Sequence, residues 1–456
     1  MTFNPHTAQD REEMLAVVGV ATTDELFEVI PADIRRPSLN QPRALTEMEA
    51  SARLAELAAK NLQLAPGSSF LGAGSYSHYV PAVVNQMLLR GEFFTAYTPY
   101  QPEVAQGTLQ VIYEFQTMVA ALLGTEVANA SLYDGATAVS EAVLMAIALG
   151  KKRERVVVSG TLHPHYREVL HTYLSGRELE ITNVPLPPVA TLVTTAEHVK
   201  EQLSDNVACV VIQYPNFYGG IEDVQAIADA VHEAGALLIV STSPVPLGIL
   251  PPPGEMGADI VTAEGQSLGV AQSFGGPYVG LLGTRKSFVR QIPGRICGIA
   301  QDTEGKRGFV LTLQTREQHI RREKATSNIC TNQGLMATAA TVYMATLGPK
   351  GFEEVSERCY HNAHYLAEVI AAEPGMEIVG EGPFFHEFVV KTSISPADIN
   401  KSLAARGIIG GLDLGRYEDA LAGHMLFCAT ELNDMAAIDQ LAVALQEIHE
   451  QKQGGE

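Results

Sequence analysis

Short apolar runs alternate with helical segments along most of the chain from Gly67 onward. Helical periodicity separates several of the runs, for instance over residues 221–235. Strands that alternate with helices are typical of a mostly parallel sheet covered by helices on both faces. In such sheets ligands lie beyond the carboxyl ends of the strands. We therefore expect an α/β fold with buried strands at 155–159, 207–214, 236–240, 258–262 and 278–283.

A tight turn joins one expected strand to a helix. Residues 129–132 read as the end of a short strand, and Asp134 then opens a small-residue turn into a helix that ends at Gly150. A helix N-terminus leaves several backbone N–H groups unpaired, and the helix dipole favours an anion there. We expect an anion pocket at Gly135, Ala136 and Thr137, with an ordinary strand–helix turn as the alternative.

Composition excludes several classes of protein. The net charge of −21 argues against a nucleic-acid partner, and no apolar run reaches the ~20 residues of a membrane span. The first residues lack the pattern of a signal peptide, and the five cysteines are scattered without a CxxC motif. We expect reduced thiols and a cytoplasmic protein. No metal site is expected, because His163 and His165 have no third ligand at metal-binding spacing.

The chain is expected to form three parts. Residues 1–65 read as an N-terminal helical arm, residues 66–340 as the large α/β domain and residues 341–456 as a smaller α/β domain. In the arm, a capping-box pattern from Thr22 to Glu25 predicts a helix over 22–30, and a second helix is expected over 45–64. The small domain is expected to contain helices at 352–372, 396–406 and 434–450, and strands at 388–391 and 425–429.

Several long stretches resemble one family. A large parallel-sheet domain with a phosphate-cradling turn, followed by a smaller α/β domain, is the plan of the fold-type I pyridoxal-phosphate enzymes, with a mostly parallel seven-stranded sheet. Within that class the chain resembles subunit 1, the alpha subunit, of the split P-protein of the glycine cleavage system. The resemblance covers essentially the whole chain and is carried by residues 93–119, NASLYDGATAVSEA, 211–223, 263–285, RICG at 295–298 and 307–333.

The resemblance implies an activity and a set of partners. The family decarboxylates glycine on pyridoxal phosphate and transfers the aminomethyl group to the lipoyl arm of the H-protein. The resemblance also implies a partner, the P-protein beta subunit, which holds the cofactor, and an α2β2 heterotetramer as the assembly. The chemistry requires a lysine for covalent attachment, an acid beside the pyridine nitrogen and an anion hole for the phosphate.

This chain departs from that set of residues at two positions. The strand expected to end in an acid ends instead in Ser241, Thr242 and Ser243. The segment expected to carry the lysine offers Glu264, Gln266 and Ser267. Lys286 follows the next strand and is read as a surface charge. The chain is therefore expected to lack the Schiff-base lysine and to hold no covalent cofactor.

Some residues remain candidates for a contribution to the partner's site. Tyr97 and Tyr100 lie on a proline-stiffened turn with Gln101 and Gln106 nearby, and their hydroxyls can reach a substrate carboxylate or phosphate; core or interface packing is the alternative. In the family fold a histidine near His163 stacks on the cofactor ring, a role that is vestigial if the pocket is empty. The Gly-rich loop at 72–79 and a basic helix with Arg316, Arg321, Arg322 and Lys324 are weaker candidates.

Three hypotheses for the function follow. The leading one is a cofactor-poor subunit that completes the active site of the beta subunit and helps to dock the H-protein. The second is a self-sufficient pyridoxal-phosphate homodimer that uses an unrecognised lysine. The third is a structural scaffold without residues in the catalytic pocket.

Overall fold

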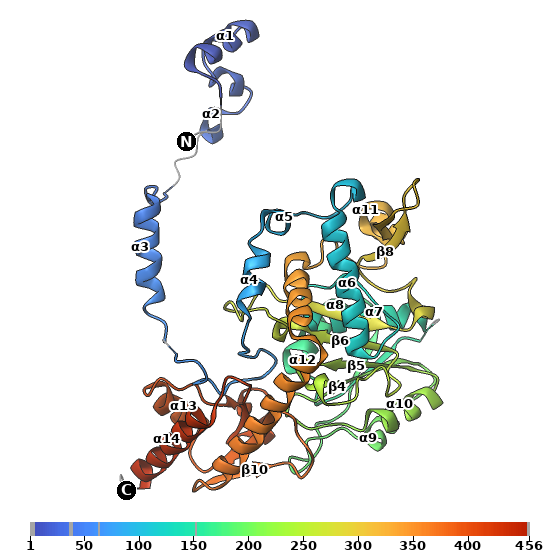
Figure 1. The fold of residues 1–456 in the computed structure, drawn as a ribbon, viewed down its shortest axis with the longest axis vertical. Coiled ribbons are helices and arrows are strands. Elements are labelled where there is room, and N and C mark those ends of the chain that lie inside the picture. The colour runs from blue at the N-terminus through green and yellow to red at the C-terminus, as the bar shows by residue number, and fades with distance from the viewer. Residues whose placement is uncertain (1–4, 36–39, 63, 151–152, 454–456) are drawn as a thin grey trace. The chain divides into compact units, whose positions relative to one another are not determined.

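The computed structural model describes residues 5–35, 40–62, 64–150 and 153–453 (Figure 1). The chain divides into two compact units, Met1–Leu62 and Gln63–Glu456. The second unit contains both the large and the small α/β regions, so the border expected near residue 340 stays a prediction. Among the described residues, no helix has the length and apolar character needed to span a bilayer.

The first unit contains α1 (Ala8–Val18), α2 (Ala32–Arg35) and α3 (Glu47–Ala58), and these helices have no buried residue. Helix α3 confirms the second predicted helix of the arm. The helix predicted over 22–30 is wrong in extent, because only the 3-10 turn Glu25–Phe27 forms there. The Thr22 hydroxyl donates to the Glu25 side chain at 3.1 Å, but no side chain caps the backbone at the start of this turn, so the capping box read from the sequence does not form.

A seven-stranded sheet forms the centre of the second unit, in the order β1-β7-β6-β5-β4-β2-β3. Neighbours from β3 to β6 pair in parallel, and β7 runs antiparallel to both of its neighbours. The predicted α/β class with a mostly parallel seven-stranded sheet is confirmed. The strands are β1 (Val127–Ala128), β2 (Arg155–Val158), β3 (Glu180–Asn183), β4 (Val207–Tyr214), β5 (Leu237–Thr242), β6 (Ile260–Glu264) and β7 (Gly280–Thr284).

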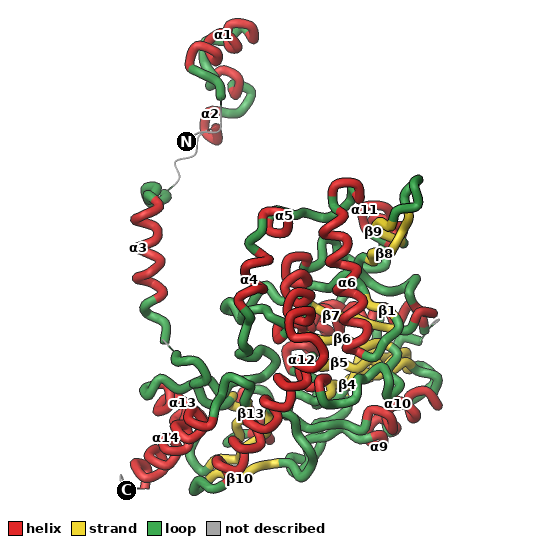
Figure 2. The backbone as a smooth tube through the Cα atoms, in the orientation of Figure 1, coloured by secondary structure: helices red, strands yellow, loops and turns green. Residues whose placement is uncertain are grey.

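Helices cover both faces of this sheet, and successive strand residues point into different cores. On β4, Val210 and Ile212 join one apolar cluster, whereas Cys209 and Val211 join the other. This alternation within a fully buried strand explains its continuous apolar sequence. The first cluster includes residues of α6 (Gln106–Leu123), α10 (Val224–Glu233) and α12 (Gly334–Ala371); the second includes α7 (Gly135–Leu149) and α8 (Pro164–Leu174) (Figure 2).

A four-stranded antiparallel sheet follows α12, in the order β10-β11-β13-β12. Helix α12 bends at Gly348, whose φ of 61° is not helical. The helices and strands predicted after residue 341 are confirmed, and the sequence missed β10 and β12. The elements are β10 (Met376–Val379), β11 (Glu387–Thr392), β12 (Leu412–Asp413), β13 (His424–Cys428), α13 (Pro396–Ala404) and α14 (Met435–Gln453).

A two-stranded hairpin, β8 (Ile296–Gln301) and β9 (Arg307–Thr312), was not predicted. It packs on α6, where the Gln106 side chain exchanges hydrogen bonds with the Phe309 backbone, donating at 2.9 Å and accepting at 2.9 Å. Gln106 therefore holds the hairpin in place, while Gln101 is exposed. The remaining helices of the second unit are α4 (Ala82–Leu88), α5 (Gly91–Phe94), α9 (Ala196–Lys200) and α11 (Gln318–Arg321).

Candidate functional site

Helix α7 begins directly after the predicted anion-binding turn. The Asp134 carboxylate accepts from the Thr137 N–H at 2.8 Å, and the Thr137 hydroxyl oxygen accepts from the Asp134 N–H at 3.1 Å. This reciprocal capping box fixes the first residue of the helix. The Thr137 N–H, predicted to face an anion, thus has a carboxylate partner within the chain.

Glu264, the last residue of β6, takes a second N–H group of the turn. Its Oε2 accepts from the Gly135 N–H at 2.8 Å, and its Oε1 accepts from the N–H groups of Gln266 at 3.0 Å and Val279 at 3.3 Å. Burial, together with the nearby Asp134 charge, raises the pKa of Glu264 to about 8 against the lowering effect of the backbone donors. A carboxyl group of the chain itself therefore lies at the N-terminus of α7.

The ring of Tyr166 fills the space between this turn and His163. The two rings stack with centroids 4.7 Å apart and planes inclined by 16°. A side chain added at Gly135 would collide with the Tyr166 hydroxyl and would lie 2.9 Å from Cβ of Glu264. The aromatic surface of His163, predicted to face a cofactor ring, is thus covered on one side by a tyrosine.

His163 is held in its neutral form. Its Nδ1 accepts from the His165 N–H at 3.2 Å, so the proton lies on Nε2, which is 3.0 Å from the carbonyl oxygen of Ala73. Burial lowers the pKa of His163 to about 4. The ring therefore orders the loop at Ala73 and carries no charge near neutral pH.

Gln266 stands where the resemblance places the lysine, and its amide is fully engaged. It accepts from the Tyr76 N–H at 2.9 Å and donates to the carbonyl oxygens of Tyr76 at 3.0 Å and Val270 at 2.8 Å. On the neighbouring strand β5, the Thr242 hydroxyl donates to backbone carbonyl oxygens, including that of Ser243 at 3.2 Å. The side chains at both positions therefore form hydrogen bonds with the backbone of the same chain.

These residues do not fit pyridoxal phosphate. Two N–H groups of the turn already bind carboxylates, Tyr166 lies against His163, and residues 241–279 contain no lysine. Lys286 is exposed on a turn after β7, as predicted for a surface charge. Within the described segment from β5 to the start of β7, no side chain offers an amine for covalent attachment.

The aromatic turn at residues 97–100 lies at the protein surface. Tyr97 is 77% exposed and Tyr100 is 42% exposed, so neither ring is core packing. Tyr97 borders a surface cavity of about 250 Å³ between this turn and the start of α12. Both apolar and polar side chains line the cavity, which is bordered by Phe93, Phe94, Ala96, Tyr97, Thr98, Pro99, Thr108, Ile112, Thr331, Asn332, Gly334, Leu335 and Thr338.

The buried side chain of Arg295 holds this turn in place. Its guanidinium is 1% exposed, pairs with Glu317 at 3.1 Å, and donates to the Tyr100 hydroxyl at 2.9 Å and the Thr98 hydroxyl at 3.3 Å. Its Cζ lies 5.0 Å from the centroid of the Tyr100 ring, in cation–π range. The RICG motif contains this arginine, but no local pattern links it to residues almost 200 positions earlier in the chain.

The predicted basic helix does not form as one element. The segment breaks into the turn Gln314–Arg316, the short helix α11 and the turn Arg322–Lys324. Arg316 points inward and donates to the carbonyl oxygens of Ile292 and, at 3.1 Å, Gly294. Arg321, Arg322 and Lys324 are exposed, so the basic residues do not share one face.

The Gly-rich loop at 72–79 lies against the small sheet. The Tyr76 hydroxyl donates to Glu387 at 2.8 Å, and the Ala73 N–H donates to the same carboxyl group. A side chain at Gly72 would lie 2.6 Å from Cβ of Cys428, so the glycine permits this close approach. The loop joins the two sheets of the second unit.

Solved structures define the class of this fold. A crystal structure of glycine decarboxylase (P-protein) of the glycine cleavage system, in inhibitor-bound form, matches with a TM-score of 0.91 at 44% identity, over 98% of this chain and 100% of that chain. A glutamate decarboxylase from Lactobacillus brevis matches with a TM-score of 0.69 at 13% identity, over 94% of this chain and 97% of that one, and shares the fold alone. The fold is that of the fold-type I pyridoxal-phosphate-dependent enzymes.

Sequence relatives define the family. A family model described as the glycine cleavage system P-protein matches residues 1–445. A probable glycine dehydrogenase (decarboxylating) subunit 1 from Thermomicrobium roseum is 57% identical over 98% of this chain and 99% of its own length. Its counterpart from Desulforamulus reducens is 49% identical over 98% of this chain and 99% of its own length. The chain belongs to the glycine cleavage system P-protein family, and the predicted resemblance to subunit 1 is confirmed.

Replacement of Arg295 tests its role as an anchor. Arg295→Met should lower the free energy of unfolding by about 3–5 kcal/mol, because Glu317 is left as an unpaired buried charge. Arg295→Lys keeps a charge but loses the hydrogen bonds to Thr98 and Tyr100, for a smaller loss of about 1–3 kcal/mol. Urea unfolding measures both values. The control Arg358→Met removes an exposed pair with Glu354 and should cost less than about 1 kcal/mol; equal losses in all three variants would contradict the assignment.

The raised pKa of Glu264 predicts a pH dependence. Because this pKa rises from an ordinary value of 4.5 to about 8, the folded chain keeps a proton that the unfolded chain has released between these values. The free energy of unfolding should therefore fall as pH rises through this range. In Glu264→Gln the fall between pH 5 and 8 should be smaller by on the order of 1 kcal/mol or more. Urea unfolding at several pH values measures it, with the exposed Glu197→Gln as control; an unchanged slope in Glu264→Gln would refute the prediction.

Proposed function

We propose that this chain is the cofactor-free subunit of a heteromeric, cytoplasmic P-protein. In the proposed enzyme a beta subunit holds pyridoxal phosphate, and the two chains together act as a glycine dehydrogenase (aminomethyl-transferring). The enzyme decarboxylates glycine and passes the aminomethyl group to the lipoyl group of the H-protein. An α2β2 heterotetramer is the proposed assembly, with neither nucleic acid nor membrane as a partner.

The observation that carries this proposal is the carboxyl group of Glu264 at the N-terminus of α7. A phosphate at Gly135 would have to displace this carboxyl group from the N–H that it occupies. The Tyr166 ring and the Gln266 amide fill the neighbouring positions. The chain thus has the fold of the class but uses its own side chains where the class binds its cofactor.

Exposed apolar side chains support a large partner surface. Many lie in one stretch, residues 71–104, and Phe274 is completely exposed on the loop that follows Gln266. Aromatic side chains are enriched at protein interfaces, and monomeric proteins rarely expose such groups together. The members of the stretch are Leu71, Tyr79, Val83, Leu89, Phe94, Tyr97, Tyr100 and Val104.

Tyr97 and Tyr100 are the proposed contribution to the partner's active site. Arg295 holds the Tyr100 hydroxyl, so that hydroxyl keeps a fixed position at the surface before any partner binds. A preorganised donor loses little entropy when it contacts a substrate carboxylate or phosphate. Within this proposal Arg295 is a positioning residue.

The first experiment tests whether the isolated chain binds pyridoxal phosphate covalently. The purified full chain, mixed with pyridoxal phosphate, should show no borohydride-reducible aldimine absorbance, whereas the complex with the beta subunit should show one on the partner. Peptide mass spectrometry locates the reduced adduct. A stoichiometric adduct on any lysine of this chain would instead support the self-sufficient homodimer.

The second experiment removes single hydroxyl groups in the reconstituted complex. Tyr97→Phe or Tyr100→Phe should lower glycine-dependent turnover about 10-fold or more, because a hydrogen bond to a charged group contributes about 1.5–3 kcal/mol. Size-exclusion chromatography should show intact assembly. The control Tyr365→Phe, on α12, removes a hydroxyl bonded to Asp439 on α14 and should leave turnover unchanged. Full turnover in both test variants would favour the scaffold hypothesis.

A further inference from the structure

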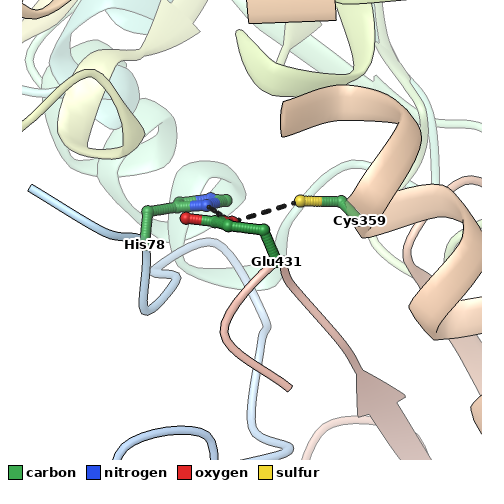
Figure 3. Close-up of side chains that lie close together, drawn as sticks. All are labelled: His78, Cys359 and Glu431. Carbon is green, nitrogen blue, oxygen red and sulfur yellow. Dashed lines mark hydrogen bonds and ion pairs between the residues drawn. The ribbon is translucent and has the colours of Figure 1, made fainter. Parts of the chain in front are cut away.

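Three potential metal ligands from distant parts of the sequence converge beside α12 (Figure 3). His78 comes from the loop before α4, Cys359 from α12 and Glu431 from the turn after β13. One ligand atom of each residue lies within 4.8 Å of the ligand atoms of the other two. The His78 Nδ1 lies 2.7 Å from Oε2 of Glu431, and the Cys359 thiol donates to the same oxygen at 3.4 Å.

The cluster is shielded from solvent and one of its polar atoms lacks a partner. The side chains of His78 and Glu431 are 3% and 9% exposed, and Cys359 is fully buried. The Nε2 of His78 is buried and has no hydrogen-bond partner among the described residues. Because Nδ1, 2.7 Å from Glu431, is the atom offered to the ion, the unpartnered Nε2 is not itself a ligand of the site.

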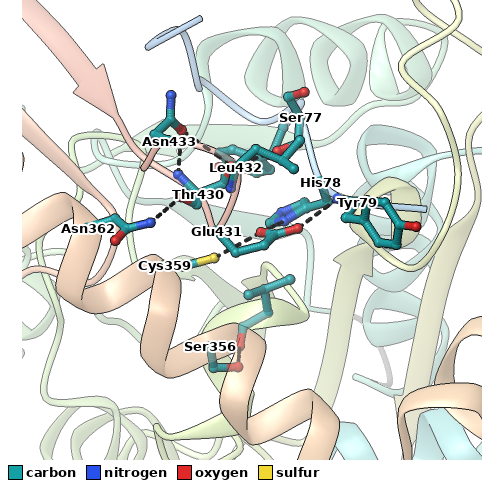
Figure 4. Close-up of polar contacts among 12 residues, drawn as sticks. Ser77, His78, Tyr79, Ser356, Cys359, Asn362, Thr430, Glu431, Leu432 and Asn433 are labelled. Carbon is teal, nitrogen blue, oxygen red and sulfur yellow. Dashed lines mark hydrogen bonds and ion pairs between the residues drawn. The ribbon is translucent and has the colours of Figure 1, made fainter. Parts of the chain in front are cut away.

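Backbone hydrogen bonds hold the ligands in position (Figure 4). The second carboxylate oxygen of Glu431 accepts from the Tyr79 N–H at 2.7 Å, next to the histidine ligand. The preceding residue, Thr430, donates through its hydroxyl to the Ser77 carbonyl at 2.7 Å, and its own carbonyl accepts from Asn362 on α12 at 2.9 Å. Such outer contacts orient ligands before an ion binds.

We propose that His78, Cys359 and Glu431 bind a divalent transition-metal ion, with zinc as the best chemical match. Zinc takes nitrogen, sulfur and carboxylate ligands together. On binding, the Cys359 thiol releases its proton to solvent, and the thiolate and the carboxylate then balance the 2+ charge. No electron is transferred, and water supplies the remaining coordination position.

The distances suit this ion after a small adjustment. Bond lengths of about 2.0–2.3 Å in a tetrahedral site place ligand atoms about 3.3–3.8 Å apart. The sulfur–oxygen separation of 3.4 Å already meets this requirement. The nitrogen–oxygen separation of 2.7 Å needs to open by about 0.6 Å. The ion would replace the two hydrogen bonds to Glu431 by three bonds to protein ligands, and would link the 72–79 loop to α12 and to the turn after β13.

The test uses the full chain, stripped with a chelator and titrated with metal alone. Zinc should bind at one equivalent per chain, and cobalt(II) should give a sulfur-to-cobalt charge-transfer band. Cys359→Ser should lose the band, and Glu431→Gln should weaken binding by more than the about 10- to 100-fold that loss of an outer-shell contact costs. Cys330→Ser, which removes an exposed thiol, should keep both signals.

A thermal measurement guards against a folding defect in the variants. Zinc should raise the unfolding midpoint of the unchanged chain and of Cys330→Ser, and should leave that of Cys359→Ser where it is. Substoichiometric zinc in the unchanged chain would overturn the proposal. So would a charge-transfer band or a zinc-induced shift that survives in Cys359→Ser.

Discussion

The hydrogen bond between the Gly135 N–H and the Glu264 carboxyl group governs the rest of this structure. It links the end of a central strand to the start of the helix that packs behind the sheet. It also satisfies a group that a helix N-terminus otherwise leaves for an external anion. A side chain of the chain itself therefore occupies the position where a helix N-terminus of this fold would receive a phosphate. Tyr166 and Gln266 likewise contact groups of the same chain nearby.

Most of the fold could be predicted from local patterns. The buried strands of the large sheet are continuous apolar runs, and both the α7 turn and the small C-terminal sheet lie close to their predicted places. The errors fall where local signals conflict with tertiary contacts. The Thr22 hydroxyl bonds the Glu25 side chain and does not cap a helix, and the basic segment after β9 turns inward at Arg316 to satisfy carbonyl groups.

The sequence alone shows that residues 241–243 contain no acid and that residues 241–279 contain no lysine, whereas the contacts of the candidate site could not be predicted from it. The roles of Glu264 and Arg295 depend on partners 129 and 195 positions away, and the His78–Glu431 pair spans 353 positions. Spacing along the chain carries no signal for such contacts, so the expectation of no metal site considered only neighbouring histidines.

The Gln266 amide also bears on how readily such a chain regains independent catalysis. Its side chain supports a loop through one accepted and two donated hydrogen bonds, and a lysine in its place retains no acceptor. A single codon change that restored the amine would therefore loosen the 72–79 loop while Glu264 and Tyr166 still filled the pocket. An amine placed at this position alone therefore costs the loop its contacts without opening space at the start of α7.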